Sequence, residues 1–430
     1  MQKQLKSWEM VFRGWGIVCA TALVLPHPAW ADDFTDALVG GKVSGDIRMR
    51  YESVSDDSLD ASVTPAQKLK DADALTVRTR LGYETAAFMG FSVMAEFEDT
   101  RTLFGVDSYA PESSHTPAYA TIADPSVTEL NRAFLRYSGV SKLDLAYGRQ
   151  RIIYDNARFI GNVGWRQDEQ TFDGFTAVYK GLPDFTLNYA YLTQVNGILS
   201  TFDAENIADN LFNVSYSGFA WGKFTTYAYL LDHDDETDPS VNGSLRFKTN
   251  DTYGLRFDGD YPVAKSTKLL YTAEYAKQSF EKQSGDDYDT DYKFLELGAS
   301  YDMPAVVLMG KLAYEQLGSD SGNLGFQTPF ATKHAFNGWA DKFLATPADG
   351  LEDRFATFGV TFKPQKIKVL AVYHTFDAAE GSNDYGSEWD LLLSKAYGKH
   401  YVTGIKYASY SGKDVYADTD KLWVWGEVKF

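Results

Sequence analysis

Residues 420–430, DKLWVWGEVKF, close the chain and decide its fold. Read as a strand, they alternate between two faces: one carries Leu422, Val424, Gly426, Val428 and Phe430, and the other carries Trp423, Trp425, Glu427 and Lys429. A chain that ends inside a strand leaves unpaired amides and carbonyls, so we expect its own first strand to cover them. A barrel closed in this way, with an apolar outer face, fits a bilayer. An amphipathic strand in a soluble β-protein is the alternative.

The rest of the chain repeats one unit, a strand of about eleven residues followed by a connection. Short and long connections alternate strictly, as in a transmembrane barrel with short periplasmic turns and long outer loops. We predict an all-β, single-chain, antiparallel transmembrane barrel of 18 strands. The strands are 41–52, 74–86, 90–101, 127–138, 142–153, 170–180, 184–195, 209–219, 222–232, 249–259, 266–278, 291–302, 305–317, 351–362, 366–377, 385–397, 401–412 and 418–430. Weak sidedness at 222–232 and 305–317 leaves 16 strands as the alternative.

The N-terminus has the order of a secretory signal peptide: a basic start, an uncharged run over 14–25, and the small-residue pattern Ala29-Trp30-Ala31. We predict cleavage after Ala31, which gives a signal peptide over 1–31 and one barrel domain over 32–430. The uncharged run is too short to cross a bilayer as a helix. The only cysteine, Cys19, lies within that run, so the mature chain has no thiol.

Charge and composition exclude some partners. The whole chain carries a net charge of −18, and removal of residues 1–31 takes away three basic residues and one acid, which leaves 38 basic against 58 acidic residues. A chain this acidic is a poor match for nucleic acid. Net charge does not set the sign of a pore, because acidic loops and a basic lumen coexist in one chain. The 15% of aromatic residues suits the aromatic girdles of a membrane barrel.

Arginine is concentrated early in the mature chain, where eleven of its fourteen arginines lie between residues 48 and 166. Guanidinium groups grip carboxylates bidentately, so a column of them passes an anion from site to site. The predicted pore-lining residues are Arg48, Arg50, Arg78, Arg80, Arg132, Arg136, Arg149, Arg151, Arg158 and Arg166. Strict alternation points Arg149 and Arg151 outward, so their inward placement needs a bulge at Gly148 or a position above the membrane.

Acidic residues on the same inner faces offer a second interpretation. We predict the lumen acids to be Glu84, Glu96, Glu98, Asp168 and Glu169. If the arginines pair with acids such as these, or with Glu52 and Asp144, they brace a polar interior. A paired arginine has little field left for a solute.

Two long connections, 154–169 and 318–350, carry apolar anchors and are too mixed in composition for plain surface loops. Folded into the lumen, the first would place Arg158, Arg166, Asp168 and Glu169 at a constriction. An exposed cap that contacts lipopolysaccharide is the alternative for both connections.

Four pieces of sequence resemble the alginate-export family of outer-membrane porins: LTVRTRLGYE (75–84), AFLRYSG (133–139), GRQRIIYDNARFIGNVGWRQDEQTFDGF (148–175) and TPFATKHAFNGWADKFLATPADGLED (328–353). The resemblance implies an eighteen-stranded barrel, a basic lumen narrowed by inserted loops, and diffusion of a polyuronate or a smaller anion. It also implies selectivity roles for Arg78, Arg80, Arg136, Arg149, Arg151, Arg158 and Arg166. Termination on Phe430 resembles bacterial outer-membrane proteins, whose last residue the barrel assembly machinery reads. Eighteen-stranded selective porins resemble monomers, so we expect a monomer.

Other classes of function match the sequence less well. A hydrolytic enzyme needs a nucleophile beside a matched base, and the six histidines lie far apart, so we predict no catalytic site. The acidic run Asp286, Asp287, Asp289 and Asp291 is a candidate Ca²⁺ site, but it lacks the glycine and terminal glutamate of an EF-hand loop. We expect no other cofactor.

The sequence therefore predicts a porin of the bacterial outer membrane, in contact with lipid and lipopolysaccharide. We expect it to pass anionic solutes, such as an alginate-like polyuronate or an acidic sugar, by passive diffusion along an arginine-lined lumen. The alternative is a general or cation-preferring porin whose arginines are structural braces.

Overall fold

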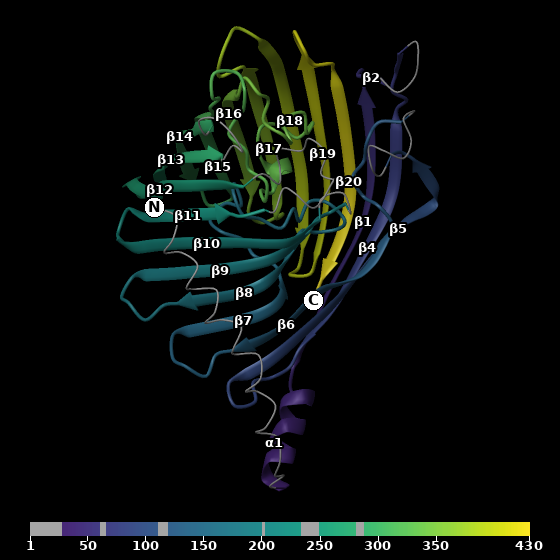
Figure 1. Cartoon of the computed structure of the whole chain (residues 1–430). Helices are drawn as coiled ribbons and strands as arrows, with labels where there is room; N and C mark the ends of the chain where they lie inside the picture. The colour runs from purple at the N-terminus through teal and green to yellow at the C-terminus, as the bar shows by residue number, and fades with distance from the viewer. Residues whose placement is uncertain (1–27, 61–65, 111–118, 200–202, 234–248, 281–287) are drawn as a thin grey trace, which may run out of the picture.

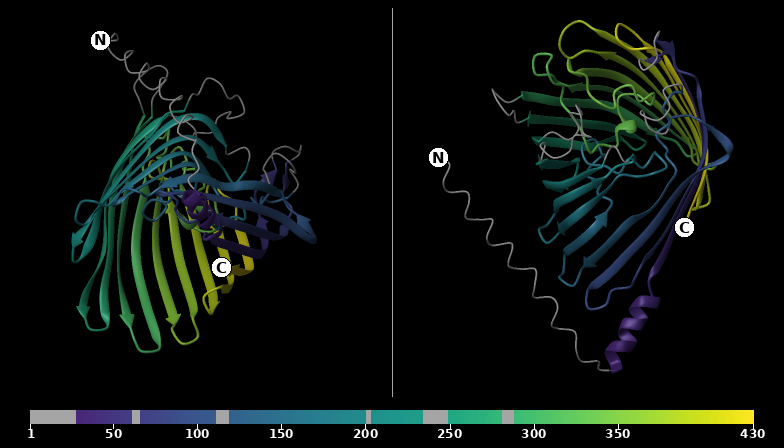
Figure 2. Two further views of the ribbon diagram at one scale, coloured as in Figure 1. Left: turned by 90° about the horizontal axis from the view of Figure 1, so that it is seen from below. Right: turned by 45° about the vertical axis from the view of Figure 1, so that its right-hand side comes forward.

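The computed structural model describes residues 28–60, 66–110, 119–199, 203–233, 249–280 and 288–430. Its main sheet has 18 strands, each antiparallel to the next along the chain. Because β1 pairs with both β4 and β20, the sheet closes into a barrel (Figure 1 and Figure 2). The connections alternate between short turns at one end and long loops at the other, as predicted.

The barrel strands are β1 (Lys42–Asp56), β4 (Ala72–Glu84), β5 (Phe91–Ser108), β6 (Val127–Tyr137), β7 (Leu143–Gln150), β8 (Thr171–Tyr179), β9 (Phe185–Asn196), β10 (Ala204–Phe219), β11 (Gly222–Leu231), β12 (Asn250–Ala264), β13 (Thr267–Phe280), β14 (Tyr288–Asp302), β15 (Val306–Leu317), β16 (Leu351–Phe362), β17 (Ile367–Asp377), β18 (Asp384–Tyr397), β19 (Tyr401–Gly412) and β20 (Thr419–Lys429). The prediction of 18 strands is confirmed. The alternative of 16 is wrong, because β11 and β15 pair with both of their neighbours despite their weak sidedness. A two-stranded sheet of β2 (Leu59–Asp60) and β3 (Gln67–Lys68) stands apart.

The last strand closes the barrel as the terminal sequence predicts. Glu427 of β20 lies opposite Arg48 of β1. Beyond β20, the Phe430 amide donates to the Gly45 carbonyl at 3.0 Å, and the Gly45 amide donates to the Phe430 carbonyl at 2.9 Å. A Cβ at Gly45 would lie 2.2 Å from the Phe430 ring, so glycine makes room where the terminal ring crosses β1.

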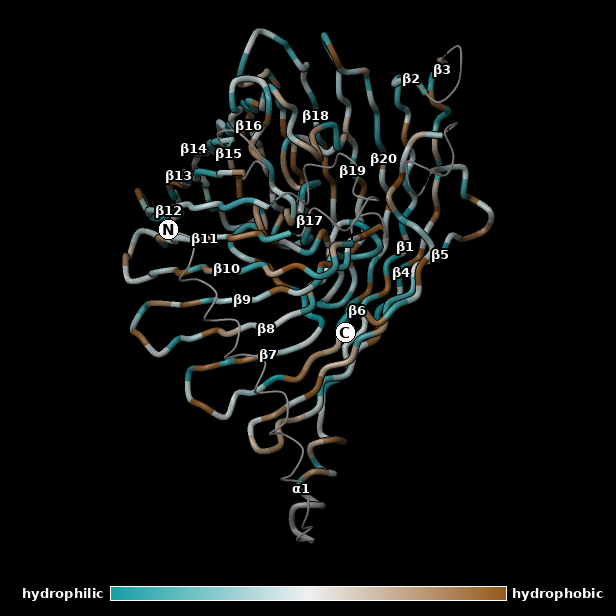
Figure 3. Tube along the Cα trace, viewed as in Figure 1, coloured by the Kyte–Doolittle hydropathy of each residue, from teal (hydrophilic) through white to brown (hydrophobic). Residues whose placement is uncertain are grey.

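The two faces of the wall differ as a membrane barrel requires. Tyr147 and Leu312 on the outer face are each 69% exposed, whereas Arg50 and Arg78 on the inner face are 1% exposed. Figure 3 shows the resulting alternation of hydrophilic and hydrophobic residues along the strands. Exposed aromatic residues gather next to the short turns, at Tyr179, Phe185, Phe219, Trp221, Tyr261, Tyr301, Phe362, Tyr397 and Tyr401. This band matches the girdle expected at a membrane interface.

The hydrophobic core lies inside the barrel, where two long connections pack against the wall (Figure 2). We call residues 151–170 and 318–350 together the plug; the second part contains the 3₁₀ helix η5 (Lys333–Ala335). Phe326 and Phe330 of the plug and Trp423 of β20 are fully buried together. The barrel interior is therefore filled by chain as well as by side chains of the wall.

Helix α1 (Pro28–Val39) lies at the short-turn end of the barrel (Figure 1). The Phe34 ring lies 5.5 Å from that of Phe88, and the Ala86 amide donates to the Ala37 carbonyl at 3.0 Å. Residues 1–27 lie outside the described residues, and the predicted cleavage point after Ala31 falls within α1, so cleavage stays a prediction. No helix in the described ranges has the length and apolarity to cross a membrane.

Candidate functional site

Arginines of the first strands form one cluster on the inner wall. Arg48 lies directly opposite Arg78 in the β1–β4 register, and Arg50 and Arg80 lie one inward position away on β1 and β4 respectively. All four side chains are buried. Alternation places them inside because the intervening residues, such as Met49, form the apolar outer face. Two guanidinium groups set opposite each other repel, so this wall needs acceptors.

The first part of the plug supplies many of those acceptors. Arg48 donates through Nε to Gln167 Oε1 at 3.0 Å, and through its Nη atoms to the carbonyls of Gly164 at 3.2 Å and Trp165 at 2.8 Å. Arg50 also donates to the Trp165 carbonyl. The wall thus holds the plug through charge-assisted bonds to its backbone.

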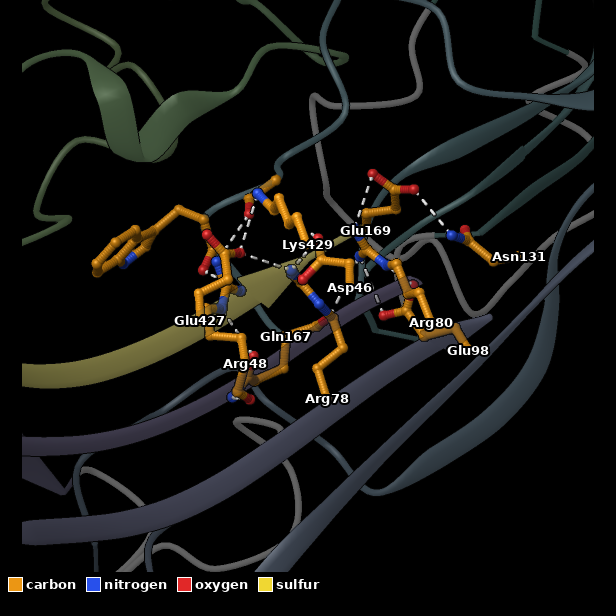
Figure 4. Close-up of polar contacts among 12 residues, drawn as sticks. Asp46, Arg48, Arg78, Arg80, Glu98, Asn131, Gln167, Glu169, Glu427 and Lys429 are labelled. Carbon is orange, nitrogen blue, oxygen red and sulfur yellow. Dashed lines mark hydrogen bonds and ion pairs between the residues drawn. The ribbon is translucent and has the colours of Figure 1, made fainter. Parts of the chain in front are cut away.

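Carboxylates supply the remaining acceptors for the clustered arginines (Figure 4). Arg78 pairs with Asp46 at 2.7 Å and with Glu427 at 3.2 Å, which links β4, β1 and β20. Arg80 donates to Glu98 of β5 at 3.1 Å and lies 3.5 Å from Glu169 of the plug.

The next strand continues the pattern through a bulge. The β5–β6 register shifts between Glu96 and Phe97, which brings both Asn131 and Arg132 inward. Arg132 pairs with Glu96, its Nε 2.8 Å from Oε1. Asn131 donates to Glu96 at 2.9 Å and to Glu169 at 2.8 Å, and therefore joins the wall to the plug.

Arg136 and Arg151 occupy the edges of this cluster. Arg136 lies towards the short-turn end, where it pairs with Glu84 at 2.6 Å and approaches Asp144 at 3.5 Å, and its side chain is 36% exposed. Arg151 follows β7 and turns inside, where its Nε donates to Glu169 Oε2 at 2.8 Å.

Arg149 is placed differently from the prediction. It shares the outer face of β7 with Tyr147 and pairs with Asp173 of β8 at 2.8 Å. Gly148 has a φ of +128°, but the register of β7 with β6 and β8 is continuous there, so no bulge turns Arg149 inward. The prediction that Arg149 lines the pore is therefore wrong, and plain alternation describes its position at the long-loop end of β7.

Arg158 and Arg166 tie the two parts of the plug to each other and to the wall. Arg158 pairs with Glu315 of β15 at 2.7 Å and donates to Asn337 Oδ1 at 3.0 Å. Arg166 pairs with Glu52 of β1 at 2.9 Å and with Asp341 at 3.1 Å. Backbone bonds between 157–161 and 330–332 join the two parts directly.

The two plug acids behave differently. Burial alone would raise the pKa of Glu169, but Arg80 and Arg151 lower it to about 2, so this carboxylate is charged. Burial, with Glu98 and Glu129 nearby, raises the pKa of Asp168 well above its ordinary value. In the described part of the chain, Oδ1 of Asp168 has no hydrogen-bond partner.

Sequence reasoning missed a second cluster at the centre of the plug. The Lys406 ammonium of β19 lies 3.7 Å from the Trp339 ring centroid, 4.4 Å from that of Trp165, and 2.7 Å from His334 Nε2. Asp341 pairs with His334 Nδ1 at 2.7 Å, although burial lowers the pKa of this imidazole to about 3. No local pattern in the sequence indicates this cluster, because its members come from two loops and one distant strand. Glu427, by contrast, follows from the closing register, which sets it opposite Arg48.

The candidate Ca²⁺ run is only partly described. Asp286 and Asp287 lie outside the described residues, Asp289 stands at the start of β14, and Asp291 pairs with Lys293 at 2.8 Å. Within the described ranges, no three His, Cys, Asp or Glu side chains are placed to hold a metal ion. Binding of Ca²⁺ stays a prediction.

Comparisons with known proteins agree with this architecture. The family model described as alginate export matches residues 41–313, more than half of the chain. OccAB4 of Acinetobacter baumannii is 14% identical over 91% of this chain and 98% of its own, with a TM-score of 0.67. OccK9 (OpdG) of Pseudomonas aeruginosa is 12% identical over 92% of this chain and 100% of its own, also with a TM-score of 0.67. OpdK of the same organism, solved with vanillate, is 13% identical over 91% of this chain and 99% of its own, with a TM-score of 0.65. At these identities the structures show a shared fold. A search of curated proteins finds no match.

Proposed function

The chain belongs to the alginate export family of bacterial outer-membrane porins, and on that premise we propose that it is a passive channel, selective for small hydrophilic solutes, in which the interior arginines anchor the plug. It is a porin of the bacterial outer membrane and not an enzyme. Reading of Phe430 by the assembly machinery, contact with lipopolysaccharide and a monomeric state remain predictions.

The main support for the proposal is that carboxylates already neutralise the charge of nearly all of these arginines. Of the ten that the sequence singled out, nine have a carboxylate within ion-pair distance. Seven of these carboxylates belong to the wall, Glu169 belongs to the plug, and Asp124 lies in the connection between β5 and β6. A buried, paired guanidinium holds its partner in place and offers little field to a passing anion.

Selectivity for small solutes follows from the space beside the plug. A cavity of about 570 Å³ lies between the plug and strands β12–β17, and a second of about 320 Å³ lies beneath residues 150–155, against Asn188, Asn213 and Lys223. Both fall within the roughly 300–1,000 Å³ typical of small-molecule sites. A solute the size of one or two sugar rings fits this space better than a polymer does.

A channel for anions is the second candidate. Among the described residues, Arg48 alone of the ten arginines has no carboxylate within ion-pair distance, and it binds only carbonyls and an amide oxygen. The name of the family refers to alginate, a polyuronate, and OpdK was solved with vanillate, a carboxylate. These facts favour an acidic sugar or a polyuronate as the solute.

The reversal potential of the purified protein in a planar bilayer under a salt gradient separates the candidates. With the arginines as anchors, we expect weak or cation-directed selectivity and no block by an added uronate oligomer. Arg48→Ala should then loosen the plug and change the conductance, but it should not lower any preference for anions. Clear anion selectivity that falls in Arg48→Ala, together with block by the oligomer, would support the second candidate and reject the first.

A further inference from the structure

We infer that the cavity between the plug and strands β12–β17 binds a pyranose ring that is neutral or carries an amino group. The inference rests on the proposed function, because it names the solute class that the channel selects. The cavity lies across the barrel interior from the arginine cluster and uses different side chains.

The register of the wall explains why space remains at this position. Glu296 of β14, Ala313 of β15 and Phe355 of β16 lie in one row across the sheet. Glu296 and Phe355 line the cavity of about 570 Å³, and Ala313 between them is not one of its lining residues. The small side chain of Ala313 fills little of the space between its two larger neighbours.

Aromatic faces form one side of the cavity. The Phe294 and Phe355 rings lie 6.5 Å apart between centroids, with 26° between their planes, so they present one nearly continuous apolar surface. Phe336 and Trp339 of the plug line the same cavity. A pyranose ring has an apolar C–H face that packs on such surfaces and a rim of hydroxyl groups that does not.

Fixed polar groups form the rim. Lys311 pairs with Glu296 at 2.9 Å, and Arg256 pairs with Asp258 at 2.9 Å and with Glu274 at 2.6 Å. Asp258 and Glu296, which line the cavity, keep lone pairs free to accept from sugar hydroxyls.

The lining acids have basic partners: Asp258 shares Arg256 with Glu274, Glu296 pairs with Lys311, Asp260 pairs with Lys268 at 2.9 Å, and Glu315 pairs with Arg158 at 2.7 Å. His374, which also lines the cavity, pairs with Asp353. The shared Arg256 leaves one carboxylate in excess over the cations, which favours an ammonium substituent and opposes a carboxylate.

The plug side of the cavity is held rigidly. Asn337, with a φ of +54°, donates to Glu315 at 2.7 Å and to Asp353 at 3.3 Å, and Arg158 donates to it. The Trp339 amide donates to Asp390 at 3.2 Å. Phe336 and Trp339 therefore start from fixed backbone positions, which lowers the entropic penalty of binding.

Three sugars that share a pyranose ring test the inference: D-glucose, D-glucosamine and D-glucuronate. We expect block of single-channel current by glucosamine and glucose at several-fold lower concentration than by glucuronate. Phe355→Ala should lower the affinity for glucosamine and for glucose by roughly two- to tenfold, the range for loss of one aromatic contact. The matched control is Phe358→Ala on the same strand. The Phe358 ring is exposed on the outer face, so its removal should leave block by the three sugars unchanged.

A second readout needs neither a variant nor an open channel. Titration of the detergent-solubilised wild-type protein by tryptophan fluorescence, with Trp339 in the cavity wall, should give the same order of affinities. Equal affinity for the three sugars, or an unchanged response in Phe355→Ala, would overturn the inference. If the protein conducts no ions, the proposed function fails, and the titration still decides whether the cavity binds a sugar.

Discussion

Arg166 shows how a single interior residue is fixed by its surroundings. It reaches Glu52 on the wall and Asp341 on the other part of the plug, and all three side chains are buried. A buried ion pair adds little net stability over an apolar contact, but removal of one partner leaves an uncompensated charge. Such residues therefore specify where the plug sits more than they strengthen the barrel.

Arg166→Ala tests this position. Glu52 loses its Arg166 contact and Asp341 loses one of its cationic partners, so we expect the plug contacts to weaken by about 3–5 kcal/mol. Hydrogen exchange over 151–170 should rise by about a hundredfold or more while the barrel stays folded, because each 1.4 kcal/mol is about a factor of ten. Arg354→Ala is the control, because Arg354 pairs with Glu352 and Asp377 at the surface and should change exchange little. Unchanged exchange in Arg166→Ala would show that the arginine does not anchor the plug.

Asp168 gives a prediction about pH. Because burial raises its pKa, the folded protein keeps a proton that the unfolded chain releases above about pH 4, so this residue lowers folding stability as pH rises. Asp168→Asn removes that loss. We expect the same melting temperature as wild type at pH 3.5 and a higher one at pH 8, measured by circular dichroism in detergent. An equal difference at both pH values would contradict a titrating Asp168.

At the scale of elements, the plug is set by turns that only some residues adopt. Gly338 has a φ of +83°, and a Cβ there would lie 2.3 Å from Glu388 Oε2 on β18. The turn lies between Asn337 and Trp339, which bond to the wall. Close approach of backbone and wall therefore depends on the absence of a side chain at this position.

Gly338→Ala should displace this part of the plug from β18. Gly381→Ala is a matched control, because Gly381 has a φ of +87° but open space around its missing Cβ. Both changes carry the strain of a left-handed alanine, about 1–2 kcal/mol, and only the first adds a clash. We expect larger and noisier single-channel conductance in Gly338→Ala alone. The same conductance in both variants would mean that backbone strain, and not contact with Glu388, matters.

At the scale of the whole molecule, the barrel depends on one seam between its two ends. The seam joins β1 to β20 and carries the Phe430 ring over Gly45. Closure satisfies every ladder of the sheet and removes the edges that an open sheet would expose to lipid.

Gly45→Val should impair this seam. The added side chain occupies the place of the Phe430 ring, and overpacking of this kind costs about 1–3 kcal/mol. Gly426→Val is the control, because a Cβ at Gly426 meets nothing within 4 Å. We expect a lower folded fraction in Gly45→Val, seen as reduced heat-modifiable migration on gels after refolding into detergent. Equal folded fractions would show that the terminal ring is not needed for closure.

The wall of the barrel can be derived from local patterns in the sequence. Alternation along each strand predicted which side faces lipid, because it is a local property of the chain. The order of short and long connections predicted 18 strands but left 16 open, and only the pairing of β11 and β15 with both neighbours excluded 16. Alternation also placed Arg48 and Arg78 inside and, read strictly, Arg149 outside, where the structure has it. The pairing of β20 with β1 followed from the unsatisfied edge of the last strand.

The contacts of the interior arginines, by contrast, depend on how distant segments pack together. Their partners include Asp124, Asp341 and the carbonyls of 164–166, which lie in irregular segments without periodicity. The cluster around Lys406 and the cavity between the plug and strands β12–β17 depend on side chains from several elements that meet in space. Periodicity predicts which face of a strand a residue occupies, but not which residue of another segment lies beside it in the closed barrel. From the sequence, the arginines were therefore consistent both with a column that conducts anions and with a set of plug anchors. The fold places acidic side chains next to them, which favours the anchors.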